Sequence, residues 1–205
     1  SPGPTPAQNT RDVMLEAERA EPTLEYLERF HYASRRHVVL ALLWHTMLRM
    51  DSARAIDLRD YHPEEGCVEI RHRPETGTPL KNQATGERLV ALSDELCQLL
   101  DDWIAERRPD VVDDYGRNPL LTTNQGRLSG SGLRGHVYRV TRPCQVGQEC
   151  PHDRDPDECE AVGWDQASKC PSSVSPHAIR RGAITNHLNS DVPENVVGDR
   201  ANVSK

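Results

Sequence analysis

His177 and Arg180 lie three residues apart, so on a helix their side chains share one face, and Arg181 follows directly. An arginine can donate two parallel hydrogen bonds to a phosphate, and an imidazole can take up or release a proton near neutral pH. The spacing therefore indicates a site for phosphate chemistry. A solvated polar helix face produces the same spacing by chance, so the interpretation depends on what the rest of the chain provides.

The segment that starts at Ser175 must position this pair. Serine is a favoured N-cap residue, and proline, here Pro176, is favoured at the first helical position. These signals predict a helix of about 14 residues with His177 in its first turn. At that end of a helix the unpaired N–H groups and the helix dipole favour an anion. Pro193 predicts one more short helix.

Two earlier segments each present a further basic residue. Residues 35–50 are apolar nearly all round, which predicts a central helix with Arg49 near its end. Residues 67–73 alternate between apolar and polar, residues 87–92 have β character, and turn-forming residues separate them. This predicts an antiparallel hairpin with Lys81 in its connection.

The remaining periodic segments predict helices capped by Ser93 and Ser131, the first running to Pro109. The second has an apolar stripe, and several arginines lie off that stripe: Arg134, Arg139 and Arg142. The expected fold class is therefore mainly α (α+β), with helices around one small antiparallel sheet. Residues 1–20 begin with a proline-rich stretch and are expected to be a partly disordered linker.

The 205-residue chain is acidic on average, with 32 acidic and 25 basic residues and a net charge of −7. Taken alone, this balance argues against a nucleic-acid partner. The basic residues are concentrated in a few segments, however, and could form one basic face in the folded chain. No apolar run is long enough to cross a membrane, and no secretory signal is recognisable. We therefore expect a cytoplasmic protein without a membrane partner.

Four of the six cysteines crowd into residues 144–170 with the spacing C-x5-C-x8-C-x10-C, and we call them the cysteine cluster: Cys144, Cys150, Cys159 and Cys170. Without a secretory signal, such crowding favours metal binding over disulfides. We predict a structural zinc site in this insertion, with His152 as an alternative ligand. Four free cysteines in a loop are the competing interpretation.

Three segments together resemble tyrosine recombinases and phage integrases, most closely those of halophilic archaea. They are Leu43–Arg49 (LWHTMLR), Leu80–Leu92 (LKNQATGERLVAL) and Ser175–Arg180 (SPHAIR). They occur in the order of the family's first-arginine, lysine-hairpin and His-x-x-Arg boxes. The resemblance extends over residues 21–205 and implies one integrase-like catalytic domain with a helical fold.

The resemblance also implies a mechanism, in which a tyrosine attacks a DNA phosphate, a 3′-phosphotyrosyl bond forms and a 5′-hydroxyl leaves. No metal or other cofactor is expected for catalysis. Double-stranded DNA is the expected partner, with assembly into a tetramer on it. The implied catalytic residues are Arg49, Lys81, His177, Arg180 and Arg200. The expected DNA-binding residues are Arg134, Arg139, Arg142 and Arg181.

The sequence departs from the family pattern at four points, one of which is Ser52, where an acid is usual, although Asp51 is adjacent. Met47 stands where a glycine is usual, and Arg200 stands where a second histidine or a tryptophan is usual. The last tyrosine is Tyr138, well before His177, whereas the family's nucleophile follows the position of Arg200 by a short helix. We interpret this as a chain cut before its nucleophile, so the fragment itself should not cleave DNA.

Two other functions compete with recombination. The chain could be a catalytically inactive, integrase-like protein that binds DNA. It could also be a zinc-dependent enzyme that uses the cysteine cluster with an acid such as Glu149 or Glu158.

Overall fold

The computed structural model describes residues 13–202, so most of the expected linker over residues 1–20 lies outside the described part. The described end of that segment is part of the fold. Leu15 is buried, and the first helix begins at Ala17. The folded domain thus starts before the predicted boundary at residue 21.

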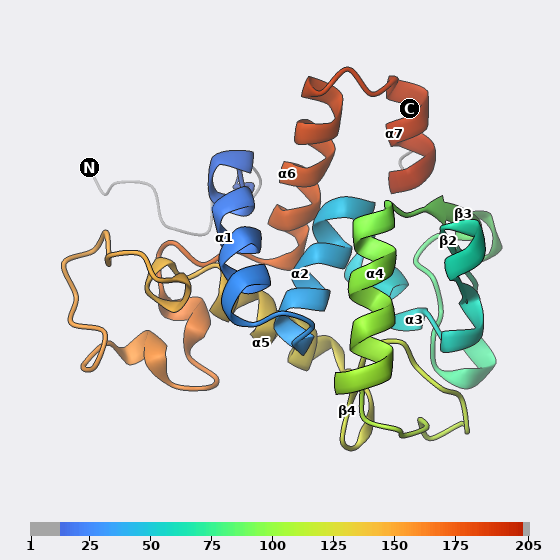
Figure 1. The fold of residues 1–205 in the computed structure, drawn as a ribbon, viewed down its shortest axis with the longest axis horizontal. Coiled ribbons are helices and arrows are strands. Elements are labelled where there is room, and N and C mark those ends of the chain that lie inside the picture. The colour runs from blue at the N-terminus through green and yellow to red at the C-terminus, as the bar shows by residue number, and fades with distance from the viewer. Residues whose placement is uncertain (1–12, 203–205) are drawn as a thin grey trace, which may run out of the picture.

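Helices make up most of the described chain, as predicted. They are α1 (Ala17–Phe30), α2 (Arg35–Thr46), α3 (Met50–Ala55), α4 (Asp94–Asp102), α5 (Gly130–Val140), α6 (Pro176–Asn189) and α7 (Glu194–Ala201). A π-helical turn, Trp103–Arg107, continues α4. The apolar α2 lies at the centre and packs against α1, α4, α5 and α6 (Figure 1). None of the helices within residues 13–202 is long and apolar enough to cross a membrane.

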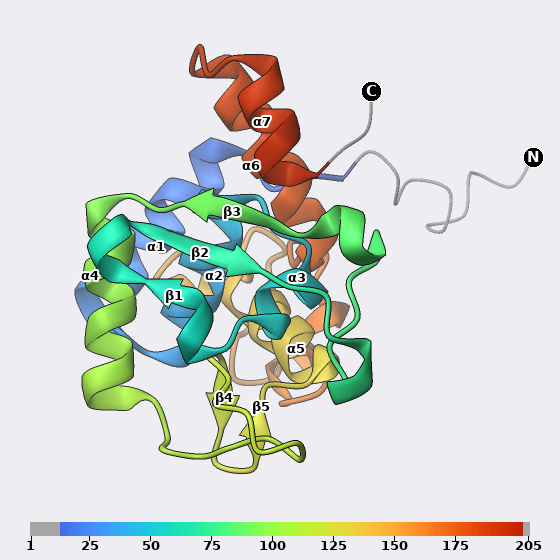
Figure 2. The same ribbon diagram turned by 90° about the vertical axis from the view of Figure 1, so that its right-hand side faces the viewer.

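The predicted hairpin is present and belongs to a three-stranded antiparallel sheet, seen face-on in Figure 2. Its strands are β1 (Tyr61–His62), β2 (Cys67–Ile70) and β3 (Arg88–Ala91), in that order. Val68 pairs with Val90, and both are fully buried, which fixes the register. A second, two-stranded hairpin joins β4 (Thr122–Thr123) to β5 (Gly126–Arg127).

The helix that presents His177 and Arg180 starts and ends as predicted. The Ser175 hydroxyl accepts the backbone N–H of Ala178 at 3.3 Å, and α6 runs for 14 residues. The cap of α5 is Ser129 instead of Ser131, because the Ser129 hydroxyl accepts the backbone N–H of Gly132 at 3.0 Å.

The central helix is shorter than predicted, because the chain leaves the helix at Met47. Met47 is buried and has the left-handed conformation, with φ 58° and ψ 20°. Glycine adopts this conformation most easily. Here the turn is nevertheless made by a methionine, and it releases the chain so that Arg49 comes just before α3.

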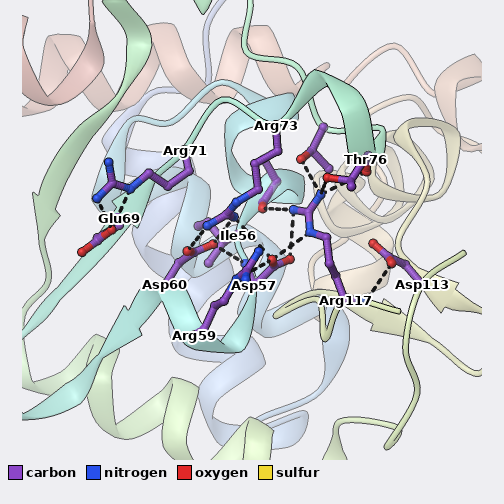
Figure 3. Close-up of polar contacts among 12 residues, drawn as sticks. Ile56, Asp57, Arg59, Asp60, Glu69, Arg71, Arg73, Thr76, Asp113 and Arg117 are labelled. Carbon is purple, nitrogen blue, oxygen red and sulfur yellow. Dashed lines mark hydrogen bonds and ion pairs between the residues drawn. The ribbon is translucent and has the colours of Figure 1, made fainter. Parts of the chain in front are cut away.

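A buried ionic network fixes the loops beside the sheet (Figure 3). Asp57 is 1% exposed and accepts hydrogen bonds from Arg117 at 2.9 and 3.1 Å. Arg127 also pairs with Asp57, and Arg73 bridges from the hairpin to Asp60 at 2.6 Å. The network therefore ties the hairpin connection that carries Lys81 to the body of the domain.

Gly182 allows the segment before α1 to lie directly on α6. The backbone N–H of Leu15 donates to the Ala178 carbonyl at 3.0 Å, and a Cβ on Gly182 would lie only 1.7 Å from the Leu15 carbonyl oxygen. We expect Gly182→Ala to lower the free energy of unfolding by at least about 1–3 kcal/mol, because the backbone at Leu15 must move to make room for the methyl group. Urea denaturation measures this loss. Gly130→Ala is the control, since its Cβ would meet only flexible side chains at 3.4 Å or beyond; an equal loss in both variants would contradict the argument.

Candidate phosphate-binding site

Basic residues from separate parts of the chain meet around one cavity of about 450 Å³, which we call the first cavity. They come from the turn before α3, the β2–β3 connection, α5 and the start of α6: Arg49, Lys81, Arg134, His177, Arg180 and Arg181. Among the described residues that line this cavity, Asp51 is the one acid, and its carboxylate pairs with Arg54 at 3.2 Å. The first cavity is therefore suited to an anion.

Arg180 is held rigidly at the inner wall. It is 5% exposed, and its two terminal nitrogens donate to the carbonyls of Met47 and Ala201, each at 2.6 Å. Burial lowers the pKa of Arg180 to about 10, with further contributions from Arg49 and Arg88. A guanidinium has five N–H donors, so three remain for a ligand. An anion between these cations would relieve their mutual repulsion.

Arg49 stands beside it, at the N-cap position of α3. One terminal nitrogen donates to the Asn202 carbonyl at 3.2 Å, just beyond α7. The guanidinium groups of Arg49 and Arg180 are therefore both aligned by carbonyls at the end of α7. The protein therefore orients both planar guanidinium groups before any ligand binds.

His177 has a lowered pKa, so its imidazole is neutral at neutral pH. Desolvation is the largest cause, followed by the charges of Arg181, Arg180, Lys81 and Arg49. A neutral imidazole can accept a proton. Lys81 is exposed in its turn and completes the rim of the cavity.

Arg88 on β3 does not line the first cavity, but its charge interacts with those of Arg49 and Arg180, and sequence reasoning missed it. Its Nε donates to the Arg200 carbonyl at 3.0 Å, and one terminal nitrogen donates to the Gly86 carbonyl at 2.7 Å. Burial and the charge of Arg49 lower the pKa of Arg88 to about 10. The available signal was strand alternation, which places Arg88 on the same side as the buried Val90.

Arg200 is not brought to the first cavity. Its guanidinium donates to the Ala91 carbonyl at 2.8 Å, so it fastens α7 to β3. The prediction that Arg200 is a catalytic residue therefore stays a prediction, without support from the lining of the first cavity.

A second cavity, of about 440 Å³, lies along α5 and shares Arg134 with the first. Arg139 stacks over the Trp164 ring, with its guanidinium carbon 3.3 Å from the ring centre, and donates to the Trp164 carbonyl. The pKa of His136 is lowered to about 4 by burial and then by Arg35, Arg139 and Arg36, so basic groups dominate here too.

Arg142 was predicted to bind DNA, but the structure buries its side chain. Its side chain is 2% exposed, and a terminal nitrogen donates to the Cys144 sulfur at 3.3 Å. The helix ends at Val140, so Arg142 turns inward and does not continue the exposed side of α5.

The cysteine-rich segment, orange in Figure 1, lies at the end of the molecule away from the sheet. Within residues 13–202, no three His, Cys, Asp or Glu side chains are placed to hold a metal together, so the cysteine cluster is not assembled. His152 instead hydrogen-bonds the Ser172 hydroxyl at 2.8 Å. The pKa of Cys159 is lowered, first by the N–H of Ala161 and also by the nearby Arg154 and Arg142. Glu149 and Glu158 are exposed.

Comparison with solved structures identifies the fold. XerA recombinase matches with a TM-score of 0.65 and 14% identity over 100% of this chain. The Tn1549 transposon integrase with circular intermediate DNA matches with a TM-score of 0.67 and 17% identity over 94% of this chain. XerH recombinase with its palindromic difH substrate matches with a TM-score of 0.63 and 17% identity over 98% of this chain. This chain spans 58%, 59% and 49% of those chains, respectively. No protein-family model and no curated protein matches the sequence. The domain thus has the catalytic-domain fold of tyrosine recombinases.

Proposed function

We propose that this chain is the phosphate-binding catalytic domain of a tyrosine-type, site-specific DNA recombinase. The observation that carries the proposal is the convergence of Arg49, Lys81, His177 and Arg180 on the first cavity from three separate segments. These are the residues on which the sequence resemblance rests. The fold supports the same function, since the similar chains are recombinases and an integrase.

In the proposed reaction a DNA phosphate occupies the first cavity. Arg49 and Arg180 donate to its non-bridging oxygens, where negative charge accumulates in the transition state. Neutral His177 accepts a proton beside the nucleophile, and Lys81 protonates the leaving 5′-oxygen. A tyrosine oxygen forms the bond to phosphorus while the bond to the 5′-oxygen breaks, so no metal or nucleotide cofactor is needed.

No tyrosine that could act as the nucleophile is among the described residues that line the first cavity. The sequence has no tyrosine after Tyr138, and among the described residues Tyr138 lines the second cavity, not the first. The second candidate is a protein that binds DNA through the same site without cutting it. Both candidates use the same phosphate site.

The basic groups of the second cavity extend the proposed DNA contact along α5. Arg134 joins the two cavities, and Arg181 lines the first. Phosphate contacts of this kind position a duplex without reading its sequence. Assembly into a tetramer on DNA, as the resemblance implies, is part of the proposal.

A nicked suicide duplex tests the proposal in the gene product that contains this chain. We expect a covalent protein–DNA adduct that survives denaturation and forms equally well in EDTA. Specific binding without any adduct would select the second candidate. Cleavage that requires a divalent metal and leaves no adduct would contradict the proposed mechanism.

A further inference from the structure

Trp164 is an exposed aromatic side chain on a loop that is itself anchored. It is 70% exposed, whereas Trp44 and Trp103 are each 2% exposed. The loop is fixed on both sides of Trp164, because Ala161 and Ala167 are buried. A single exposed apolar residue is common on protein surfaces, so the surroundings of Trp164 decide whether its ring has a function.

Arg139 covers one face of the Trp164 ring. Its guanidinium carbon lies 3.3 Å from the ring centre, and its Nε and a terminal nitrogen donate to the Trp164 carbonyl at 3.2 and 3.0 Å. These contacts fix the ring against α5. Since Trp164 is 70% exposed, the opposite face of the ring is open to solvent. The protein thus presents a flat, preoriented surface on which a second planar group can stack.

The second cavity, which Trp164 lines, is basic. Arg35 and Arg134 line it as well, and Asp165 is the one acid among its described lining residues. The Nε of Arg35 donates to the Thr122 carbonyl at 2.6 Å, which orients the guanidinium and leaves its terminal nitrogens for a ligand. Cations beside an exposed aromatic ring are the combination that binds nucleic-acid strands, because phosphates contact the cations and a base stacks on the ring.

The second cavity also adjoins the proposed site of the scissile phosphate. Arg134 lines both cavities, and Arg139 lies five positions after it on α5. Five residues of α-helix span about 7–8 Å, a length that one strand of B-DNA covers in about two nucleotides. Recombination joins each cut end to a new partner, so base pairs beside the scissile phosphate must open. An unpaired base has lost stacking neighbours, which an aromatic side chain replaces.

We propose that Trp164 stacks on an unpaired base of the DNA strand whose phosphate occupies the first cavity, while Arg35 and Arg134 contact the backbone of that strand. The base lies within about two nucleotides of that phosphate. Neutral His136 lines the same cavity and offers one N–H donor and one acceptor to the edge of a base. This contact rests on the proposed function, because it needs a DNA phosphate in the first cavity.

Tryptophan fluorescence of the 205-residue chain tests the contact without any variant. Trp164 is the accessible fluorophore, since Trp44 and Trp103 are buried. We expect a single-stranded oligothymidylate of about eight nucleotides to quench the Trp164 emission and to protect it from acrylamide. A fully paired duplex should do so less, because its bases already stack on one another. Unchanged emission and acrylamide quenching at saturating single strand would overturn the proposal.

Substitutions separate base stacking from phosphate binding. Trp164→Ala should lower the affinity for a labelled single strand about 5- to 150-fold in anisotropy titrations, with less than about a twofold change for a paired duplex. Trp164→Phe keeps an aromatic ring and should recover most of the affinity. Phe30→Ala is the matched control and should bind as the wild type does, because Phe30 is 57% exposed beneath Arg29 but does not line the second cavity. Equal affinity losses for single strand and duplex, or none for either, would overturn the proposal.

Both measurements work without strand cleavage, so their outcome is separate from that of the suicide duplex. A covalent adduct without quenching of Trp164 would support the recombinase and remove the contact. Quenching without an adduct would keep the contact in a protein that binds DNA without cutting it. The fluorescence of the wild type also decides the matter if Trp164→Ala folds poorly.

Discussion

Replacing Asp57 with alanine is expected to lower the free energy of unfolding by about 3–5 kcal/mol, because it leaves buried arginines without a counter-ion. The side chains of Arg117 and Arg127 are only 7% and 8% exposed, and both pair with Asp57. Urea denaturation is the suitable measurement, since guanidinium would screen the charges.

An exposed ion pair provides the control for this variant. Asp51 pairs with Arg54, but its side chain is 56% exposed. Asp51→Ala should therefore change the unfolding free energy by less than about 1 kcal/mol. If the two variants lose a similar amount of unfolding free energy, burial of the Asp57 network contributes nothing to stability.

The same network sets a pH dependence. Burial alone would raise the pKa of Asp57, but hydrogen bonds and charges from Arg117 and Arg127 lower it overall. A carboxylate with a depressed folded-state pKa stabilises the fold above its unfolded value of about 3.9, and this contribution is lost as pH falls through the folded value. Stability of the wild type should thus fall more steeply below about pH 4 than that of Asp57→Asn.

Replacing Arg180 with alanine is expected to reduce single-turnover DNA cleavage about 100- to 1,000-fold, the usual cost of losing one preorganised donor to a developing anion. Arg180→Lys should recover little, because an ammonium cannot hold two carbonyls and a phosphate in one plane. Rates are measured on the nicked duplex with the gene product that contains this chain.

Two comparisons keep this prediction specific. Arg29→Ala removes a cation from α1, which does not line the first cavity, and should leave the rate unchanged. The unfolding free energy of Arg180→Ala must be measured in parallel, since the lost hydrogen bonds to Met47 and Ala201 also hold the fold together. A well-folded Arg180→Ala that cleaves at the normal rate would exclude this residue from the site.

Local signals predicted the elements that carry the site. The cap at Ser175, the apolar helix before Arg49 and the hairpin around Lys81 depend on near neighbours in sequence, and the structure confirms each element. The two-residue strand β1 was missed, because so short a segment has no readable alternation.

Contacts between distant residues could not be predicted in this way. Asp57 and Arg117 are 60 positions apart, and no spacing rule connects them. Arg142 was placed on an exposed helix side only because the helix was assumed to continue past Val140. Its inward turn depends on tertiary packing, as does the attachment of Arg200 to β3.

The contacts of Arg49 and Arg180 with the end of α7 have a thermodynamic consequence. The two guanidinium groups that face the first cavity also hold the carbonyls of Asn202 and Ala201. An anion that draws these groups toward itself must alter the hydrogen bonds that secure the last turn of α7. This coupling is reciprocal: the factor by which anion binding shifts the equilibrium position of that turn equals the factor by which a displaced turn changes the affinity for the anion. Occupancy of the cavity and the position of the backbone at residue 202 are therefore linked variables.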